Sequence, residues 1–498
     1  MSEKAREIII IGGAIAGLMT ALALARRGFK VSIVDQDAGE LPATVDNIFE
    51  DWDRKGAPQT KHTHYFLARV YQLIRDREPG LLEKLKQAGA VERKFFELAD
   101  ASFDSPEFVE GDDDITMIGC RRIVFEWVLR RYLLDTGLVE IRTGIKVIGL
   151  KSDSRSDGIP VITGIKTEFA DGSLKELPAD LVIESCGQRS RLGKWLKSVT
   201  DTPMHQESSP SGIFYSTRFY QFLEGEKPPS DAIGVGGDLG YLRFGIAPAD
   251  NNTFSITIVG YSDDKEVRPL LKTKHFDTFV KNMPSMWEWV KTARPLTDAI
   301  GMSNFDNVHR SLIVDGKPIA LGIIMVGDSA TSLNPEGGAG CSLAAMSAWA
   351  FADMYSHDKS LYQLAMENEA FVQEQVKPRF HLQAKIDRRN IRAKNANDKQ
   401  LTRGEKPEKR NEMLEDIFLA SAEDVRVMRR QYRITQMLEE AIEPQEDAVL
   451  IDLVMQAKQK RNERTAAGDD VSSGIVGSTG MNLSEGTRRA ELIAMIND

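Results

Sequence analysis

Residues 8–17 of this chain, Ile-Ile-Ile-Ile-Gly-Gly-Ala-Ile-Ala-Gly, decide its fold. The isoleucines form a β-branched run typical of a buried parallel strand, and the Ala/Leu-rich residues 18–27 have the composition of a helix packed on a sheet. Gly12 permits a tight turn, and Gly17 permits close contact between helix and sheet. The helix start offers free N–H groups to a pyrophosphate, although Ala14 replaces the middle glycine of a G-x-G-x-x-G pattern.

A carboxylate follows at the expected distance. Asp35 ends the second hydrophobic strand, eighteen residues after Gly17, where it can accept hydrogen bonds from a ribose. The turn, the helix and the acid together favour dinucleotide binding over a plain strand–helix–strand unit. Because an acid at this place suits a free ribose diol, the nucleotide is expected to be FAD or NAD.

Composition excludes several classes of protein. The 498 residues predict roughly three domain-sized units, and the formal charge of -10 disfavours nucleic acid and anionic lipid as partners. The three cysteines, Cys120, Cys186 and Cys341, lie far apart, so we expect a reducing cytoplasm, no disulfide framework and no metal site. The uncharged residues 8–25 are explained as strand, turn and helix, so no integral membrane segment is predicted.

Three further segments carry motifs. They are residues 54–64 (RKGAPQTKHTH), 120–131 (CRRIVFEWVLRR) and 323–343 (IIMVGDSATSLNPEGGAGCSL). In these motifs and their order, the chain resembles the flavoprotein monooxygenases related to aromatic hydroxylases over roughly residues 7–460, and within that family a subgroup that includes polyether-type polyene epoxidases. A weaker fourth match, residues 179–191, carries Glu184 and Cys186 where the family more often has aspartate and threonine.

The resemblance implies FAD as cofactor and assigns residues to it. Asp328 would bind the ribityl chain, and the backbone at the start of the helix after Pro335 would stabilise negative charge on the reduced flavin. Gly337 stands where the subgroup often has an aromatic residue, which predicts a more open pocket. The roles of His62 and His64 stay open.

Two sets of site residues are therefore expected. The catalytic set is Pro335, Gly338, Gly340 and Cys341. The cofactor-binding set is Gly12, Ala14, Gly17, Asp35, Pro58, Gln59, Arg122, Asp328, Gly338, Gly340 and Cys341.

The expected fold is α/β, with a Rossmann-like FAD-binding domain, an inserted antiparallel β substrate domain and a C-terminal helical region. The predicted division is 1–204 (FAD-binding domain, first part), 205–304 (β-sheet substrate domain), 305–375 (FAD-binding domain, second part), 376–464 (C-terminal helical region) and 465–498 (mobile tail with at most a short helix at 484–496).

The resemblance predicts an FAD-dependent monooxygenase that inserts one oxygen atom from O2 into an apolar small-molecule substrate, by epoxidation or hydroxylation, through a flavin hydroperoxide. NAD(P)H would supply electrons directly or through a separate flavin reductase, because no second complete G-x-G-x-x-G exists. The alternatives are an FAD-dependent dehydrogenase or prenyl reductase, a flavin-binding protein without turnover, and a flavin-dependent halogenase. Trp287-Glu288-Trp289 is similar to the halogenase W-x-W-x-I-P signature but lacks its Ile and Pro.

Overall fold

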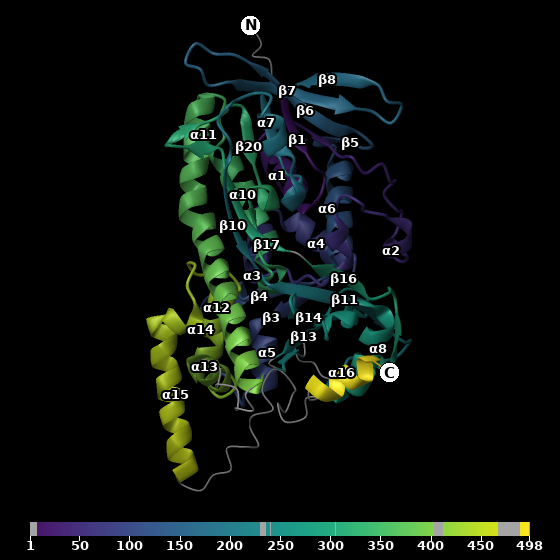
Figure 1. Ribbon diagram of the computed structural model, residues 1–498, viewed down its shortest axis with the longest axis vertical. Coiled ribbons are helices and arrows are strands. Elements are labelled where there is room, and N and C mark those ends of the chain that lie inside the picture. Colours follow the sequence, from purple (N-terminus) through teal and green to yellow (C-terminus); the bar gives the residue numbers. More distant parts are fainter. Residues whose placement is uncertain are drawn as a thin grey trace.

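The computed structural model describes residues 7–229, 236–239, 241–303, 305–402, 412–466 and 489–497. These residues form an elongated α/β molecule (Figure 1). A parallel sheet with its helices lies in the middle, an antiparallel sheet lies below it in the view, and a long helix runs beside both. In the described ranges, no helix is both long and apolar enough to cross a membrane.

The central sheet is parallel and has the strand order β20-β9-β1-β2-β5. Its strands are β1 (Glu7–Ile11), β2 (Lys30–Val34), β5 (Val139–Arg142), β9 (Leu181–Glu184) and β20 (Ile323–Met325). Because successive side chains of a strand point to opposite faces, Ile8 and Ile10 belong to one core cluster and Ile9 and Ile11 to another. Both faces of the sheet are therefore buried, as the run of isoleucines predicts.

Helices cover the Ile8 face of the sheet, and a small antiparallel sheet with a short helix covers the Ile9 face. The helices are α1 (Ile15–Arg26), α3 (Ala68–Arg77), α4 (Pro79–Gln87), α6 (Arg122–Thr136) and α10 (Ala339–Met354). The other layer contains β6 (Lys146–Asp153), β7 (Val161–Glu168), β8 (Leu174–Pro178) and α7 (Leu192–Leu196).

A second, antiparallel sheet has the order β12-β13-β14-β11-β15, and β16 also pairs with β11. Its strands are β11 (Ile213–Phe222), β12 (Gly236–Asp238), β13 (Leu242–Pro248), β14 (Thr253–Tyr261), β15 (Ala293–Pro295) and β16 (Ile300–Ser303). One face packs against α8 (Thr273–Asn282), α9 (Pro284–Val290) and α16 (Arg489–Asn497). The other face lines the cavity described below.

Shorter elements connect these layers. They are α2 (Ile48–Asp51), β3 (Val91–Lys94), α5 (Phe95–Ser102), β4 (Thr116–Gly119), β10 (His205–Pro210), β17 (Asp306–Ser311), β18 (Ile313–Val314), β19 (Lys317–Pro318) and β21 (Thr331–Ser332). Strand β17 lies between β10 and β21 in a sheet of three strands.

The C-terminal region is helical, as predicted. It contains α11 (Leu361–Phe371), α12 (Lys377–Thr402), α13 (Glu412–Ser421), α14 (Val425–Thr435) and α15 (Ala448–Ala466). Helices α13, α14 and α15 share a small apolar core of their own. Helix α12 contacts β10, β17 and β21, which brings the C-terminal region close to the cavity.

The short helix predicted near the C-terminus is present, but it packs against the antiparallel sheet. Residues 467–488 and 498 lie outside the described ranges, but Arg489–Asn497 forms α16. Leu492 and Ile496, four residues apart on one helix face, are 0% and 2% exposed in the core of the antiparallel sheet. Arg489 pairs with Asp264 at 2.9 Å. The sequence indicates a helix here, but the docking depends on a sheet that is distant in the sequence.

Candidate functional site

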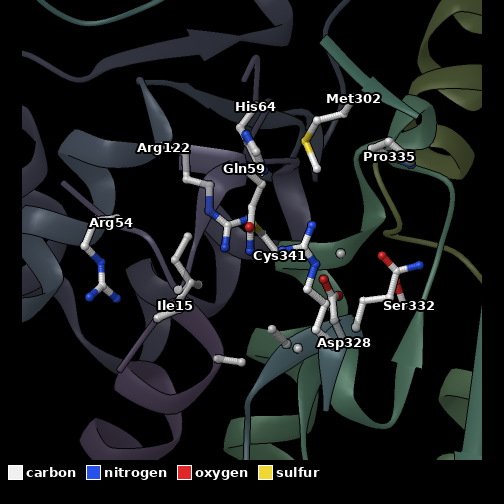
Figure 2. Close-up of a pocket in the computed structure, with 18 of the residues that line it drawn as sticks. Ile15, Arg54, Gln59, His64, Arg122, Met302, Asp328, Ser332, Pro335 and Cys341 are labelled. Atoms are coloured by element: carbon white, nitrogen blue, oxygen red, sulfur yellow. The ribbon is translucent and has the colours of Figure 1, made fainter. Parts of the chain in front are cut away.

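A cavity of about 690 Å³ lies between the two large sheets (Figure 2). At one side of the view are Ile15 and Arg54, and at the other are Met302 and Pro335. Ten of the twelve predicted site residues line the cavity: Gly12, Ala14, Asp35, Gln59, Arg122, Asp328, Pro335, Gly338, Gly340 and Cys341. Gly17 and Pro58 do not line it.

The parallel sheet explains why these residues meet. Gly12 directly follows β1, Asp35 follows β2, Ser185 follows β9, and Asp328 lies three residues after β20. The carboxyl ends of parallel strands lie on one edge of the sheet, which is where α/β proteins bind ligands. Segments far apart in the sequence therefore contribute to one site.

The first glycine turn is shaped by close backbone contacts. Gly12 has φ +105°, and a Cβ on Gly17 would lie 2.0 Å from the Gly12 carbonyl oxygen. Gly17 is therefore a packing residue, because only a glycine leaves room for the Gly12 carbonyl against the start of the helix. Ala14 is the N-cap of α1, and no described side chain caps this helix start. Its first N–H groups are thus available to an anion.

Asp35 lies at the cavity edge but is held by arginines. Its Oδ2 atom lies 3.0 Å from Arg54 Nη1 and 3.4 Å from Arg130 Nη1. The other oxygen, Oδ1, accepts one long hydrogen bond, from the Asp37 N–H at 3.3 Å. A ribose contact to Asp35 stays a prediction, and Oδ1 is the oxygen that would make it.

Sequence reasoning missed the importance of Arg54. Besides Asp35, this buried guanidinium binds Asp37 at 2.9 Å and Glu126 at 2.7 Å, and it donates to the Gly13 carbonyl at 3.0 Å. Burial by itself lowers the pKa of Arg54, but the three carboxylates raise the pKa above its ordinary value. Arg54 therefore joins the glycine turn to the second strand and to α6. The sequence feature that could have indicated this role is the place of Arg54 as the first residue of the 54–64 segment.

Arg122 and His64 form a pair whose proton positions can be assigned. Arg122 Nη1 lies 2.9 Å from His64 Nε2, and His64 Nδ1 lies 3.0 Å from the His62 carbonyl oxygen. A guanidinium can only donate and a carbonyl can only accept, so Nε2 accepts and Nδ1 carries the hydrogen. Burial and the nearby Arg122 charge lower the pKa of His64 well below 6.5, consistent with a neutral ring.

His62, by contrast, does not line the cavity. Its ring is 1% exposed, packs edge-on against Tyr215 with ring centroids 4.8 Å apart, and forms no hydrogen bond to any described residue. Burial lowers the pKa of His62 to about 4. Packing is the role that these contacts support.

Asp328 points into the cavity with an unsatisfied carboxylate (Figure 2). It makes no side-chain hydrogen bond within the described part of the chain, and burial raises its pKa although Arg122 and Arg310 act in the opposite direction. A Cβ on Gly340 would lie 3.6 Å from Asp328 Oδ1, so α10 begins directly beside this carboxylate.

The start of α10 provides a second uncapped helix N-terminus. Gly338, with φ +66°, is its N-cap, and no described side chain caps it. Cys341 lies in the first turn, where burial raises the pKa of its thiol to about 11 and keeps it neutral. The free N–H groups and the helix dipole therefore supply the positive character at this end of the cavity.

The turn before α10 is fixed by side chains from other elements. Asn334 accepts a hydrogen bond from the Glu336 N–H at 3.0 Å and donates to Asp387 of α12 at 2.9 Å. Asn307 of β17 donates to the other Asp387 oxygen at 2.7 Å. From the antiparallel sheet, Arg243 binds both oxygens of Glu336. Both the C-terminal region and the second sheet thus hold this turn.

Gly337 does not open the cavity as expected. It does not line the cavity, and a Cβ at this position would lie 3.2 Å from Gln383 Oε1 of α12. The side chain of Gln383 therefore occupies the space beside Gly337, and a larger residue there would force it to move.

The fourth sequence segment contributes Cys186 to the cavity lining and a buried acid beneath it. Glu184 is 0% exposed, accepts the Cys186 N–H at 3.3 Å, and leaves Oε2 without a partner among the described residues. Burial raises the pKa of both Glu184 and Cys186. All three cysteines are free thiols, and the described ranges contain no group of side chains arranged to hold a metal ion.

The wall contributed by the antiparallel sheet is mainly apolar. Tyr215 and Phe305 stack with ring centroids 5.0 Å apart, and the Tyr215 hydroxyl donates to Met302 Sδ at 3.4 Å. Ile213 and Val259 complete the apolar wall. Trp287 and Trp289 do not line the cavity, since Trp287 is 42% exposed and Trp289 is buried in the core behind the sheet.

The cavity has features that fit a flavin adenine dinucleotide. Its volume lies in the range of cofactor sites. Two uncapped helix starts suit a diphosphate and an electron-rich ring, and the unsatisfied Asp328 carboxylate suits a hydroxylated chain. Arg122 Nε is a buried donor without a partner among the described residues, as a donor reserved for a ligand would be.

The sequence matches no family model and no curated protein. The fold does match solved structures at low identity. One is a flavoprotein/dehydrogenase from Cytophaga hutchinsonii, with a TM-score of 0.57, 14% identity, and coverage of 93% of this chain and 100% of that chain. Another is the flavin-dependent brominase Bmp2, with a TM-score of 0.53, 15% identity, and coverage of 92% and 99%.

A third similar structure is pqsL from Pseudomonas aeruginosa, described as a probable FAD-dependent monooxygenase. Its TM-score is 0.50 at 15% identity, and the match covers 80% of this chain and 96% of that one. These comparisons establish that the chain has a fold shared with flavin-dependent proteins.

Proposed function

We propose that this protein is an FAD-dependent monooxygenase, which inserts one oxygen atom from O2 into an apolar organic substrate by epoxidation or hydroxylation. One observation carries the proposal: a single cavity joins a polar wall suited to the dinucleotide with an apolar wall suited to a substrate. The shared fold supports the flavin part of this proposal, because the similar structures include flavin-dependent proteins.

The residues of the polar wall would hold the cofactor. The start of α1 would bind the diphosphate, Asp328 would accept hydrogen bonds from the sugar-alcohol chain, and Arg122 Nε would donate one. When bound and reduced, FAD supplies the electrons and the activation of O2. NAD(P)H, directly or through a separate flavin reductase, would be the source of those electrons.

The apolar wall would position the substrate and exclude water. Tyr215, Phe305 and Met302 line the same cavity as Pro335, which precedes the start of α10. A substrate against this wall would lie next to the N–H groups of Gly340 and Cys341, which would stabilise negative charge on the reduced ring system. The Gly338 N–H cannot contribute, because it donates to the Pro335 carbonyl at 3.0 Å.

The test combines cofactor content with isotope labelling. The purified protein should contain FAD, and with NADPH, a flavin reductase and 18O2 gas it should place one labelled atom in a product from a panel of styrene, geraniol and 1-naphthol. A dehydrogenase or reductase would instead convert substrate without oxygen-18. A halogenase would give a brominated or chlorinated product that depends on added halide. Absence of FAD, or label found only in water, would contradict the proposal.

A further inference from the structure

One face of the antiparallel sheet points into the cavity. Because side chains alternate along a strand, Tyr215 and Thr217 of β11 share this face with Thr257 and Val259 of β14. The register pairs Tyr215 with Val259 and Thr217 with Thr257. An apolar pair therefore lies beside a pair of hydroxyls.

Strand β13 leaves room over these hydroxyls. Gly245 pairs with Thr257 and lines the cavity. A Cβ added to Gly245 would meet no atom within 4 Å, and the backbone there is not left-handed. The position could carry a side chain at no steric cost in this structure. Its emptiness therefore creates usable space directly beside Thr257.

The hydroxyls form a chain with one direction. Thr63 Oγ1 donates its only hydrogen to Ser255 Oγ at 2.7 Å. In its second hydrogen bond, at 2.6 Å, Thr63 must therefore accept from Thr257, which uses the only hydrogen of the Thr257 hydroxyl. Thr217 in turn must donate to Thr257 at 2.9 Å. Thr63 and Thr257 are the partly exposed members, and each has only a lone pair left. The chain can therefore accept a hydrogen bond from a ligand but cannot donate one.

Two polar groups that line this side of the cavity carry no charge that a ligand must balance. The guanidinium of Arg243 is bound by both oxygens of Glu336, and His64 is neutral by its hydrogen bonds. The charge of Arg122 does act on Tyr215, but the Arg122 guanidinium is assigned above to the flavin. With Arg122 taken by the flavin, a neutral ligand suits the site best, because a charged one would lose its hydration without gaining a partner.

We infer that Gly245, Thr63 and Thr257 form a subsite for the polar end of the substrate, here named the Gly245 subsite. It takes a neutral hydrogen-bond donor, a hydroxyl or an N–H, attached to an apolar body that lies along Tyr215, Val259 and Met302. The inference rests on the proposed function and narrows its substrate class to neutral alcohols, phenols or aromatic amines of this kind.

Binding of matched probes tests the Gly245 subsite without turnover. Isothermal titration calorimetry of the purified full-length protein would compare phenol with anisole, 1-naphthol with 1-methoxynaphthalene, and 4-phenylphenol with 4-methoxybiphenyl. Each pair differs in the donor hydrogen. The hydroxyl compound of at least one pair should bind about tenfold more tightly, the value of one hydrogen bond. Equal affinity within every pair, or binding of no compound up to its solubility limit, would overturn the inference.

Variants assign the preference to named residues. Thr257→Val should reduce the hydroxyl-to-methoxy preference to about one, whereas Thr257→Ser should retain it. Gly245→Val should weaken both members of a pair at least tenfold by filling the space. Matched controls are Thr278→Val on α8 and Gly149→Val on β6, where a Cβ meets only the Lys166 side chain at 3.7 Å. A preference that survives in folded Thr257→Val would overturn the inference, and thermal melting verifies the fold.

The outcome is separable from that of the proposed function. Calorimetry requires neither O2 nor a reductant. If the hydroxyl preference is found and depends on Thr257, but oxygen-18 enters no product, the Gly245 subsite stands and the monooxygenase proposal fails. If products are labelled but the preference is absent, the monooxygenase proposal stands and the Gly245 subsite is wrong.

Discussion

The carboxylate of Asp387 accepts a hydrogen bond from the side-chain amide of Asn334, with a distance of 2.9 Å between Oδ1 and Nδ2. Asp387 belongs to the C-terminal helix α12, and Asn334 begins the turn that leads into α10. Two regions separated by more than fifty residues are thus fixed to each other at the helix start that faces the cavity. The C-terminal region consequently acts on the geometry of the site.

Removal of the Asp387 carboxylate should therefore affect both stability and cofactor binding. In Asp387→Ala, the buried amides of Asn307 and Asn334 lose their acceptor, so the free energy of unfolding should fall by about 2–4 kcal/mol. FAD affinity should fall as well, because the turn before Gly338 is released. Urea denaturation and fluorescence titration with FAD measure the two effects. The exposed control Asp358→Ala should change neither, and an unaltered FAD affinity in folded Asp387→Ala would contradict the link.

Asp328 should behave in the opposite way with respect to stability. Its carboxylate lines the cavity and is partly exposed, it has no hydrogen-bond partner among the described residues, and desolvation raises its pKa. Asp328→Ala should leave the apoprotein as stable or slightly more stable, because a partly desolvated charge without a hydrogen-bond partner is removed. FAD affinity should fall roughly ten- to hundredfold through the loss of a charge-assisted hydrogen bond. The melting temperature of the apoprotein and an FAD titration test this, and unchanged FAD affinity would contradict the assigned role.

His62 should make the fold sensitive to acid. Its folded-state pKa is about 4, below the ordinary value of 6.5, so between these values the unfolded chain binds a proton that the folded chain does not. Stability should therefore fall as the pH decreases from about 6.5 toward 4, by up to about 1.4 kcal/mol per pH unit from this group. His62→Phe and His62→Leu should each reduce the slope of unfolding free energy against pH by about one proton. Equal slopes in wild type and both variants would refute the prediction.

The contacts of α16 predict that the C-terminus stabilises the antiparallel sheet. Leu492 is fully buried in the core shared with α8. Leu492→Ala should therefore cost about 2–4 kcal/mol of unfolding free energy, and deletion of residues 489–498 should lower the melting temperature by several degrees. The exposed control Ala494→Ser should be close to neutral. A melting temperature unaffected by the deletion would show that α16 contributes nothing to the stability of this sheet.

Much of the parallel-sheet part could be predicted from the sequence because its signals are local. The isoleucine run, the glycine turn and the Ala/Leu-rich helix are contiguous, and each has a conformation dictated by its own side chains. The segment around Asp328 and Gly338 is equally local. Ten of the twelve site residues chosen on these signals line one cavity, because strand ends in a parallel sheet converge on one edge.

The remaining features depend on contacts between distant segments. Nothing next to Arg54 in the sequence reveals that it meets Glu126, and nothing near Asn334 points to Asp387. The docking of α16 is hidden for the same reason, since the sequence predicts a short helix there but not the sheet against which Leu492 and Ile496 pack. Side-chain type and spacing determined the strands, turns and helix starts of this protein. Only the tertiary structure decided which charges are paired, which polar atoms remain unsatisfied and where the cavity stays empty, because these properties arise from neighbours that the chain brings together by folding.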